Sequence, residues 1–141
     1  MLAMSFHSLL RLPVRIALPF ALVTVACSSS NSSSSKPSGP TITNIQVPPT
    51  FTVSGTQYSV QGTLTYEDDS AAITTLHEKI PMYNLDSTDA ASLPESGTAE
   101  IVLGFVSSAA PASGTQVQID VSLIDANGNE SNVETVTVGV P

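Results

Sequence analysis

The residues best suited to chemistry in this chain are oxygen ligands gathered in one short stretch, Asp125 to Glu130. The stretch reads DANGNE, with carboxylates at Asp125 and Glu130 and amide oxygens at Asn127 and Asn129. Hard cations such as Ca²⁺ take about six to eight oxygen ligands of these kinds. The same stretch contains Asn-Gly, a dipeptide favoured at positive φ in hairpin turns. A hairpin turn is therefore the leading interpretation, and a calcium loop is the alternative.

A second acidic cluster, Glu67-Asp68-Asp69, follows a strongly alternating segment. Charged residues between two strands usually form a solvated turn, which is the first interpretation here. Asp68 and Asp69 would join the Asp125 loop as calcium ligands if the two loops met at one end of the fold. The spacing departs from an EF-hand, because Gly128 stands fourth in its loop, where that motif needs glycine sixth, and the twelfth position holds no acid. The sequence predicts no resident cofactor, with Ca²⁺ as the alternative.

A catalytic arrangement is not indicated by the remaining reactive side chains. Hydrolytic triads need a base that activates a serine or thiol, and His77 is the one histidine beyond the first 26 residues. Its neighbours Glu78 and Lys79 alternate faces on a strand, so we predict an exposed strand residue. The chain contains no G-x-S-x-G elbow, phosphate-binding glycine loop, H-E-x-x-H or cysteine zinc cluster. We therefore predict that the protein is not an enzyme.

The single cysteine, Cys27, lies between an apolar run, residues 16–26, and a serine-rich tract, residues 28–35. A lone cysteine cannot form an internal disulfide, so in an exported chain it calls for modification or intermolecular pairing. Two arginines precede the apolar run. Its eleven residues suit the apolar part of a signal peptide and fall short of the roughly 20 that cross a bilayer. We expect residues 1–26 to be a cleaved leader.

The junction at residues 24–27, TVAC, resembles the lipobox of bacterial lipoproteins. In that family a small residue precedes a cysteine that is diacylglycerylated and becomes the new N-terminus. The resemblance implies that Cys27 carries acyl chains such as palmitate and anchors the protein to the cell membrane. Thr24 and Val25 depart from the family, which usually has Leu and then Ala or Ser there. An ordinary signal-peptidase cut after Ala26 is the alternative, and it would make the protein secreted or periplasmic.

The residues after the cysteine bear on where the domain would stand. Lipoproteins retained at the inner membrane of some Gram-negative bacteria carry Asp directly after the cysteine, so Ser28 favours the outer membrane by that family rule. Residues 28–40, SSSNSSSSKPSGP, contain no large apolar side chain and cannot offset the entropy of ordering a backbone. We predict that residues 27–40 form a flexible tether with an r.m.s. span of about 20 Å.

The charge of the chain excludes several partners. It contains 12 Asp and Glu against 4 Lys and Arg, and every acid follows Cys27. Removing the leader with its two arginines leaves two bases, so the mature charge is two minus twelve, or −10. Carboxylates repel anionic partners, which argues against nucleic acid and against electrostatic docking on anionic lipid. Membrane contact would therefore go through the N-terminal lipid.

From residue 41 onward, short alternating runs are separated by turn-forming residues, the pattern of an all-β sandwich. The clearest run is 58–66, where apolar side chains or glycine occupy every second position. The same period of two predicts strands over 98–105, 117–123 and 135–140, each with one buried and one exposed face. These four strands are the basis of the fold prediction.

Weaker signals complete the count of about seven strands. A strand is predicted over 41–47, broken by Pro48-Pro49 because proline lacks an N–H, and resumed on an edge at Phe51 and Val53. Residues 73–82 are predicted as a middle strand.

In that middle strand, Leu76, Ile80 and Met82 would share a face that Glu78 interrupts. Residues 83–97 are polar and are predicted as a long connection with at most one short turn or edge strand.

Residues 116–138, QVQIDVSLIDANGNESNVETVTV, look like the final hairpin of bacterial immunoglobulin-like and fibronectin type III-like domains. In that family a strand ends in Asp, a D-x-x-G-N-like turn follows, and the last strand returns. Residues 58–69 resemble their early central strand and its acidic turn. The resemblance implies a single Ig-like antiparallel β-sandwich over residues 41–141. Its core would rest on aliphatic packing, since the chain lacks the core Trp and paired cysteines of antibody domains.

These observations predict a lipid-anchored cell-envelope protein that presents a non-catalytic Ig-like interaction or structural module. Its partner would be another envelope or surface protein, bound through sheet edges or end loops. The alternative is a calcium-dependent adhesion or ligand-binding module that uses the acidic loops.

Overall fold

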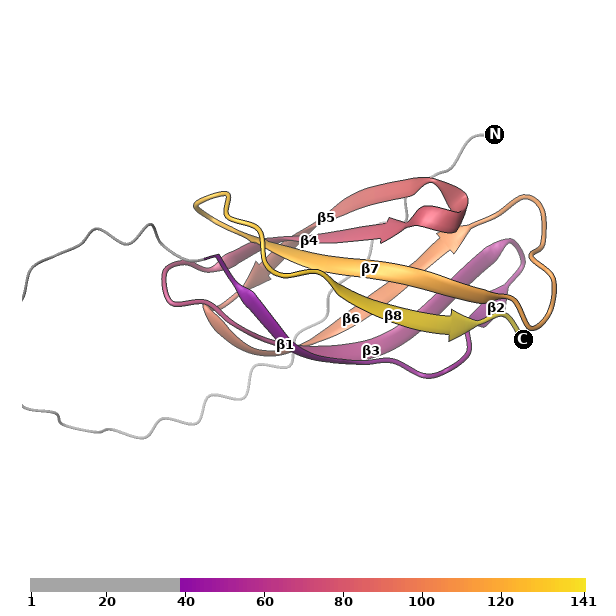
Figure 1. Ribbon diagram of the computed structural model, residues 1–141, viewed down its shortest axis with the longest axis horizontal. Coiled ribbons are helices and arrows are strands. Elements are labelled where there is room, and N and C mark those ends of the chain that lie inside the picture. Colours follow the sequence, from indigo (N-terminus) through magenta and orange to yellow (C-terminus); the bar gives the residue numbers. More distant parts are fainter. Residues whose placement is uncertain (1–38) are drawn as a thin grey trace, which may run out of the picture.

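The computed structural model describes residues 39–141, which form two antiparallel sheets packed face to face (Figure 1). The predicted leader over 1–26, the acylation site at Cys27 and nearly all of the tether over 27–40 lie outside the described residues. The described part has one 3-10 turn and no α-helix. The prediction of an all-β, Ig-like antiparallel sandwich is confirmed, with eight strands where about seven were expected.

The first sheet is built around β3 (Gln57–Glu67). β6 (Ser96–Val106) pairs with β3 along its whole length. The other edge of β3 is shared by β1 (Thr41–Gln46), which pairs with its C-terminal half, and β2 (Thr52–Ser54), which pairs with its N-terminal end. β6 therefore forms one outer edge of this sheet.

The second sheet has the order β5-β4-β7-β8. It consists of β5 (Leu85–Leu93), β4 (Ile73–Ile80), β7 (Gln116–Asp125) and β8 (Glu134–Gly139). A single 3-10 turn, η1 (Pro81–Tyr83), joins β4 to β5. β5 and β6 follow one another in the chain and are the outermost strands of their sheets on the same side of the sandwich (Figure 1).

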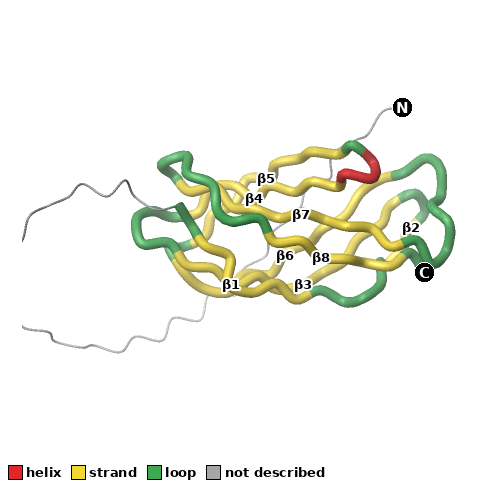
Figure 2. Tube along the Cα trace, viewed as in Figure 1, coloured by secondary structure: helices red, strands yellow, loops and turns green. Residues whose placement is uncertain are grey.

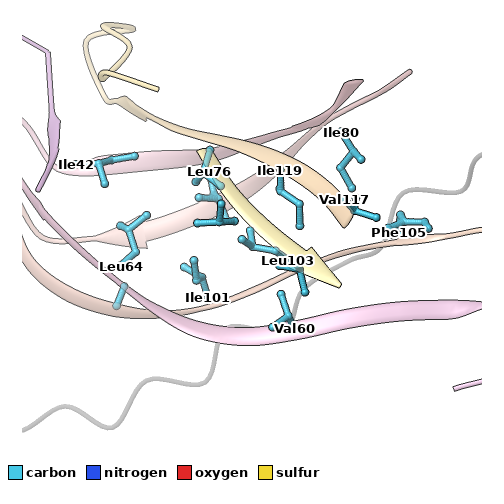
Figure 3. Close-up of a cluster of buried hydrophobic side chains, with 14 of the residues drawn as sticks. Ile42, Val60, Leu64, Leu76, Ile80, Ile101, Leu103, Phe105, Val117 and Ile119 are labelled. Carbon is cyan, nitrogen blue, oxygen red and sulfur yellow. The ribbon is translucent and has the colours of Figure 1, made fainter. Parts of the chain in front are cut away.

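The four alternating strands bury the faces that the sequence predicts. Because successive side chains on a strand point to opposite sides, period two puts one apolar row of each strand between the sheets. Figure 3 shows these side chains meeting from both sheets. The central buried residues, all at most 4% exposed, are Ile42, Tyr58, Val60, Leu64, Tyr66, Ile73, Ile80, Ile101, Leu103, Phe105, Val117, Ile119, Val121, Leu123 and Val138.

At the predicted break, Pro48-Pro49, the chain contacts the second sheet between two strands, β1 and β2, that both belong to the first sheet. Residues before it belong to the first sheet, whereas Thr50 forms a parallel bridge with Gly139 at the end of β8 in the second. The N–H of Phe51 donates to the carbonyl of Gly139 at 3.0 Å, and the N–H of Gly139 donates to Pro49 O at 2.8 Å. Proline lacks an N–H and cannot donate to a ladder, and it is tolerated here because Pro48 and Pro49 lie between β1 and β2. The N-terminal segment thereby ties the two sheets together.

The prediction for residues 83–97 is right that the range holds an edge strand and wrong that this strand is short and the rest a long connection. β5 occupies most of that range, and only two residues separate it from β6. The strand was hidden because its inward positions include Ser87, Asp89 and Ala91, which are too small or too polar to give an apolar period. Pairing with β4 holds it in place.

The alternation predicts that Met82 shares the inner face with Leu76 and Ile80, and this prediction is wrong. The chain leaves the strand at Pro81 and turns through η1, which ends at Asn84 in the left-handed region with φ 51°. Met82 is consequently 57% exposed.

An aromatic cluster closes the end of the sandwich near η1. Phe105 stacks on Tyr58 with ring centroids 4.9 Å apart and meets Phe51 edge-on at 5.5 Å. The ring of Tyr83 lies 4.6 Å from that of Phe105. Such pairs contribute about 0.5–1.5 kcal/mol beyond their buried area. The core is thus aliphatic in its middle and aromatic at this end.

Candidate functional site

The two acidic loops meet at the end of the sandwich opposite the aromatic cluster (Figure 2). The N–H of Ala126, in the β7–β8 loop, donates to the carbonyl of Ala72, in the β3–β4 turn, at 2.9 Å. The two loops therefore lie side by side, which is the arrangement that Asp68 and Asp69 need in order to join the Asp125 loop as ligands. A shared site would also require their carboxylates to point toward one another.

Asp125 organises its own loop. Its Oδ1 accepts hydrogen bonds from the N–H groups of Asn127 at 2.9 Å and Asn129 at 2.7 Å, and its Oδ2 accepts from Asn129 Nδ2 at 2.9 Å. Gly128 takes φ 81°, as a tight turn requires. Burial disfavours the charged form of Asp125, but the hydrogen bonds from Asn129, Asn127 and Gly128 outweigh it and lower its pKa. The loop has the geometry of the predicted hairpin turn.

The other predicted ligands point in separate directions. Asp68 Oδ1 accepts from the N–H and hydroxyl of Ser70, at 2.9 and 3.0 Å, while its Oδ2 is buried with no hydrogen-bond partner. Asp69 is exposed. Glu130 turns away from the loop onto the outer face of the second sheet, where its carboxylate contacts Ser122 and His77. Within residues 39–141, no group of three or more His, Cys, Asp or Glu side chains is arranged to hold a metal ion.

A polar network that the sequence did not predict lies on that outer face, around His77 of β4. His77 Nε2 lies 2.6 Å from Asp86 Oδ1 of β5, and His77 Nδ1 lies 3.2 Å from Glu130 Oε1. Ser122 of β7 donates its hydroxyl hydrogen to the same Glu130 oxygen at 2.7 Å. Lys79 Nζ lies 3.6 Å from Asp86 Oδ2. The prediction that His77 is exposed is wrong, because this network leaves its side chain only 14% exposed.

The network contains Ser, His and Asp side chains but lacks the geometry of a hydrolytic triad. Ser122 is 4% exposed, and its oxygen lies 3.4 Å from His77 Nδ1 while its hydrogen bonds Glu130. In a triad the hydroxyl must donate to the imidazole that will deprotonate it. Here each ring nitrogen faces a carboxylate instead. The arrangement joins β5 and the β7–β8 loop to β4, and it offers no activated nucleophile.

Hydrogen bonds in this network lower the pKa of its two carboxylates, Asp86 and Glu130. The bond from His77 lowers the pKa of Asp86. The bond from Ser122, followed by that from His77, lowers the pKa of Glu130. Both carboxylates are therefore held in the charged form, on opposite sides of the imidazole ring.

Glu78 lies on the opposite face of β4, inside the sandwich, and is 6% exposed. Its Oε1 accepts the backbone N–H of Gly104 in the other sheet at 2.9 Å. Burial raises the pKa of Glu78 to about 7; the bond from Gly104 opposes this, and the negative charge of Asp89 adds to it. Glu78 does interrupt an apolar face, as predicted, but its partner is not visible in the sequence.

The Glu78 bond reveals which backbone groups of β6 point outward. In an antiparallel pair, hydrogen-bonded and non-hydrogen-bonded residue pairs alternate. The N–H of Gly104 donates to Glu78, so Gly104 and Ser59 are a non-hydrogen-bonded pair. The β3–β6 register has no break, so every second pair before Gly104 is also non-hydrogen-bonded. The backbone groups at these positions face the free edge of β6: Thr98, Glu100 and Val102.

A small apolar pocket lies between β5 and β6. β5 contributes Asp89, Ala90 and Ala91, and the small alanines leave the space open. Its other walls come from the core and from β6: Leu64, Leu76, Leu93, Ala99, Ile101, Val102 and Leu123. One wall of the pocket is thus beside the free edge just described.

The described residues contain no helix long and apolar enough to cross a membrane.

Comparison with known proteins gives structural neighbours only. No protein-family model matches the chain, and no curated protein matches its sequence. Among solved structures, the PKD domain of an M14-like peptidase from Thermoplasmatales archaeon SCGC AB-540-F20 is 18% identical, with a TM-score of 0.49 over 75% of this chain and 99% of that one. The PKD1 domain of Vibrio anguillarum Epp is 13% identical, with a TM-score of 0.44 over 74% of this chain and 96% of that one.

Proposed function

We propose that the protein is a lipid-anchored cell-envelope protein whose Ig-like domain is a non-catalytic interaction or structural module for another envelope or surface protein. The observation that carries this proposal is the open side of the sandwich. There β6 turns the backbone groups of three alternate residues, Thr98, Glu100 and Val102, outward next to an apolar pocket, and no strand within residues 39–141 pairs with them. Exposed strand edges of this kind are templates for pairing with another chain.

The polar network around His77 supports the non-catalytic part of the proposal. Its serine is buried and its imidazole lies between two carboxylates, so the side chains that could have formed a hydrolytic site serve to join strands. An enzyme would have to show turnover that disappears in a His77→Ala variant.

The lipid anchor rests on Cys27 and the segment before it. Mass spectrometry of the mature N-terminus should find an acylated Cys27, and a Cys27→Ser protein should leave the membrane fraction. Stable anchoring by several acyl chains is expected, since each buried CH₂ contributes about 0.8 kcal/mol. An unmodified cysteine in a protein recovered from the soluble fraction would replace the anchor with simple secretion and leave the sandwich unchanged.

The partner is best sought by crosslinking in the native envelope followed by purification of the full chain. A specific envelope or surface protein should be crosslinked in excess over a control strain that produces an unrelated lipoprotein at the same level. Recovery of no such protein at any crosslinker length would contradict an interaction role.

A calcium-dependent adhesion or ligand-binding module is the second candidate, favoured by one observation. The buried Asp68 Oδ2 has no hydrogen-bond partner, and it lies in a turn whose backbone contacts the Asp125 loop. Calorimetric titration with Ca²⁺ should then show saturable binding and a raised Tm, both reduced by Asp68→Asn and unaffected by Glu100→Gln. Heat changes no larger than those of dilution would remove this candidate.

A further inference from the structure

We propose that the edge of β6 from Thr98 to Val102 binds an extended, basic segment of a partner protein as an added strand, with Asp89 meeting a lysine or arginine of that segment. This inference rests on the proposed interaction function and names its surface and the chemistry of its partner. It is carried by three features of the open side: backbone groups, an apolar pocket and charge.

The backbone groups define where a strand can add. Thr98, Glu100 and Val102 present their N–H and C=O groups away from β3, as the register with β3 requires. Further along, the N–H of Gly104 already donates to Glu78, so that end of the edge is closed. An inward-pointing charged residue is a known means of protecting a strand edge. Glu78 thus confines strand addition to the part of β6 before Gly104.

The pocket beside this edge gives the added strand an apolar surface to contact. Its walls are largely apolar, and Val102 lies on it directly. Because alternate residues of a strand point to opposite faces, an added strand would direct every second side chain toward the pocket. An apolar residue at that position would contact the pocket walls, and its neighbours would point to the opposite face.

Charge selects the partner. All twelve Asp and Glu of the chain lie within residues 39–141, whereas three of its four Lys and Arg lie before residue 39. Lys79 is the remaining base, so the formal charge of this part is one minus twelve, or −11. A second copy would meet the same negative charge and be repelled, and an anionic lipid surface would be repelled as well. A basic segment is attracted, and Asp89 on the wall of the pocket gives it a local counter-charge.

The direct test uses the full chain in a non-ionic detergent and a short capped peptide of alternating Lys and Val. Saturable binding is expected, weakened by added salt, and it should protect the amides of Thr98, Glu100 and Val102 from hydrogen exchange. A peptide of alternating Glu and Val should not bind. Equal binding of both peptides, or binding of neither, would overturn the proposal.

Two variants separate strand addition from general attraction. Val102→Pro removes a free-edge donor without removing a ladder bond to β3, and proline is tolerated where its missing N–H would face solvent. It should weaken peptide binding at least tenfold while the β signal in circular dichroism is retained. Asp89→Asn should weaken binding about fivefold, whereas the matched charge change Asp120→Asn, on β7, should leave it unchanged. Full binding by a folded Val102→Pro protein would show that no strand is added.

The same variant distinguishes this inference from the proposed function. If Val102→Pro still crosslinks to its partner in the envelope as the unaltered chain does, the interaction function stands and the β6 edge is not its surface. If the peptide binds as expected but no envelope protein is ever crosslinked, the edge is competent and the proposed function fails.

Discussion

The carboxylate of Glu78 in the second sheet accepts the backbone N–H of Gly104 in the first sheet at a distance of 2.9 Å. This bond crosses the open side of the sandwich, where the two sheets present their outer strands, β5 and β6. It places a titratable group inside the fold and closes part of a strand edge at the same time. A buried carboxylate is costly unless it is hydrogen-bonded, so the bond explains how Glu78 is accommodated.

Glu78 should make the domain less stable as pH rises toward neutrality. Its folded pKa is about 7, above the ordinary value of 4.5, so folding favours the protonated form. The contribution to stability is fully present below about pH 4.5, is lost between there and about pH 7, and is constant above. The loss is on the order of 3 kcal/mol. Chemical denaturation at pH 5 and pH 8 measures most of it.

Glu78→Gln keeps an oxygen for Gly104 and removes the titration. This variant should match the unaltered chain near pH 5, exceed it in stability above pH 7, and show a flat profile between. Glu100→Gln, on the exposed face of β6, is the matched control and should retain the slope. Parallel profiles for Glu78→Gln and the unaltered chain would show that Glu78 is not the titrating group.

Gly104→Ala should be severely destabilising. A Cβ at this position would overlap the carbonyl oxygen of Tyr58 and lie 2.9 Å from Ser59 Cα, and both are backbone atoms that cannot move aside. A loss above about 3 kcal/mol is expected, enough to lower the yield of folded protein. Gly55→Ala is the control: nothing lies near its Cβ, and its φ of 62° alone should cost about 1 kcal/mol. Similar Tm values for the two variants would contradict the overlap.

Asp125→Ala should unfold the β7–β8 loop, because three donors would lose their acceptor. The expected cost is about 3 kcal/mol, measured by urea denaturation, since hydrogen bonds to charged groups are the strong ones. The pKa of Asp125 is lowered in the folded state. Its contribution to stability is therefore present at neutral pH and lost as the pH falls below about 4. Asp69→Ala, in an exposed turn, should change stability by less than about 0.5 kcal/mol.

Asn132→Ala should loosen β1, which would then be held by its pairing with β3 alone. The side chain of Asn132 accepts the N–H of Ile42 at 2.7 Å and donates to the carbonyl of the same residue at 3.1 Å, so it pairs with β1 as another strand would. A loss of about 1–2 kcal/mol is expected. Hydrogen exchange should increase in β1 before any other strand. Uniform loss of protection throughout the sandwich would instead show that β1 does not open separately.

The strands that could be predicted from the sequence are those whose inner face is continuously apolar. β3, β6, β7 and β8 obey a period of two because each buries one row of side chains in the same core. For β5 the sequence predicts at most a short edge strand, because its inward positions carry Ser87, Asp89 and Ala91 and so give no apolar period. Asp89 and Ala91 both line the pocket on the open side and remove the apolar period from the sequence.

The polar groups show where sequence reasoning ends. Asp125 could be placed in a turn because its partners lie within four residues of it. His77 and Glu130 are 53 residues apart, and the bond between them depends on the pairing of β4 with β7. No local pattern encodes that register. The prediction for His77 failed for this reason, whereas the prediction for the loop did not need it.

The link between Asn132 and Ile42 also has a consequence for how the chain matures. The two residues are 90 positions apart, so β1, which pairs along one edge with β3, has its other edge fastened by a residue near the end of the sandwich. Contacts so distant along the chain close slowly, because a long loop must be ordered before they form. This attachment therefore forms only after residue 132 has been made. Until then β1 is held by its pairing with β3 alone.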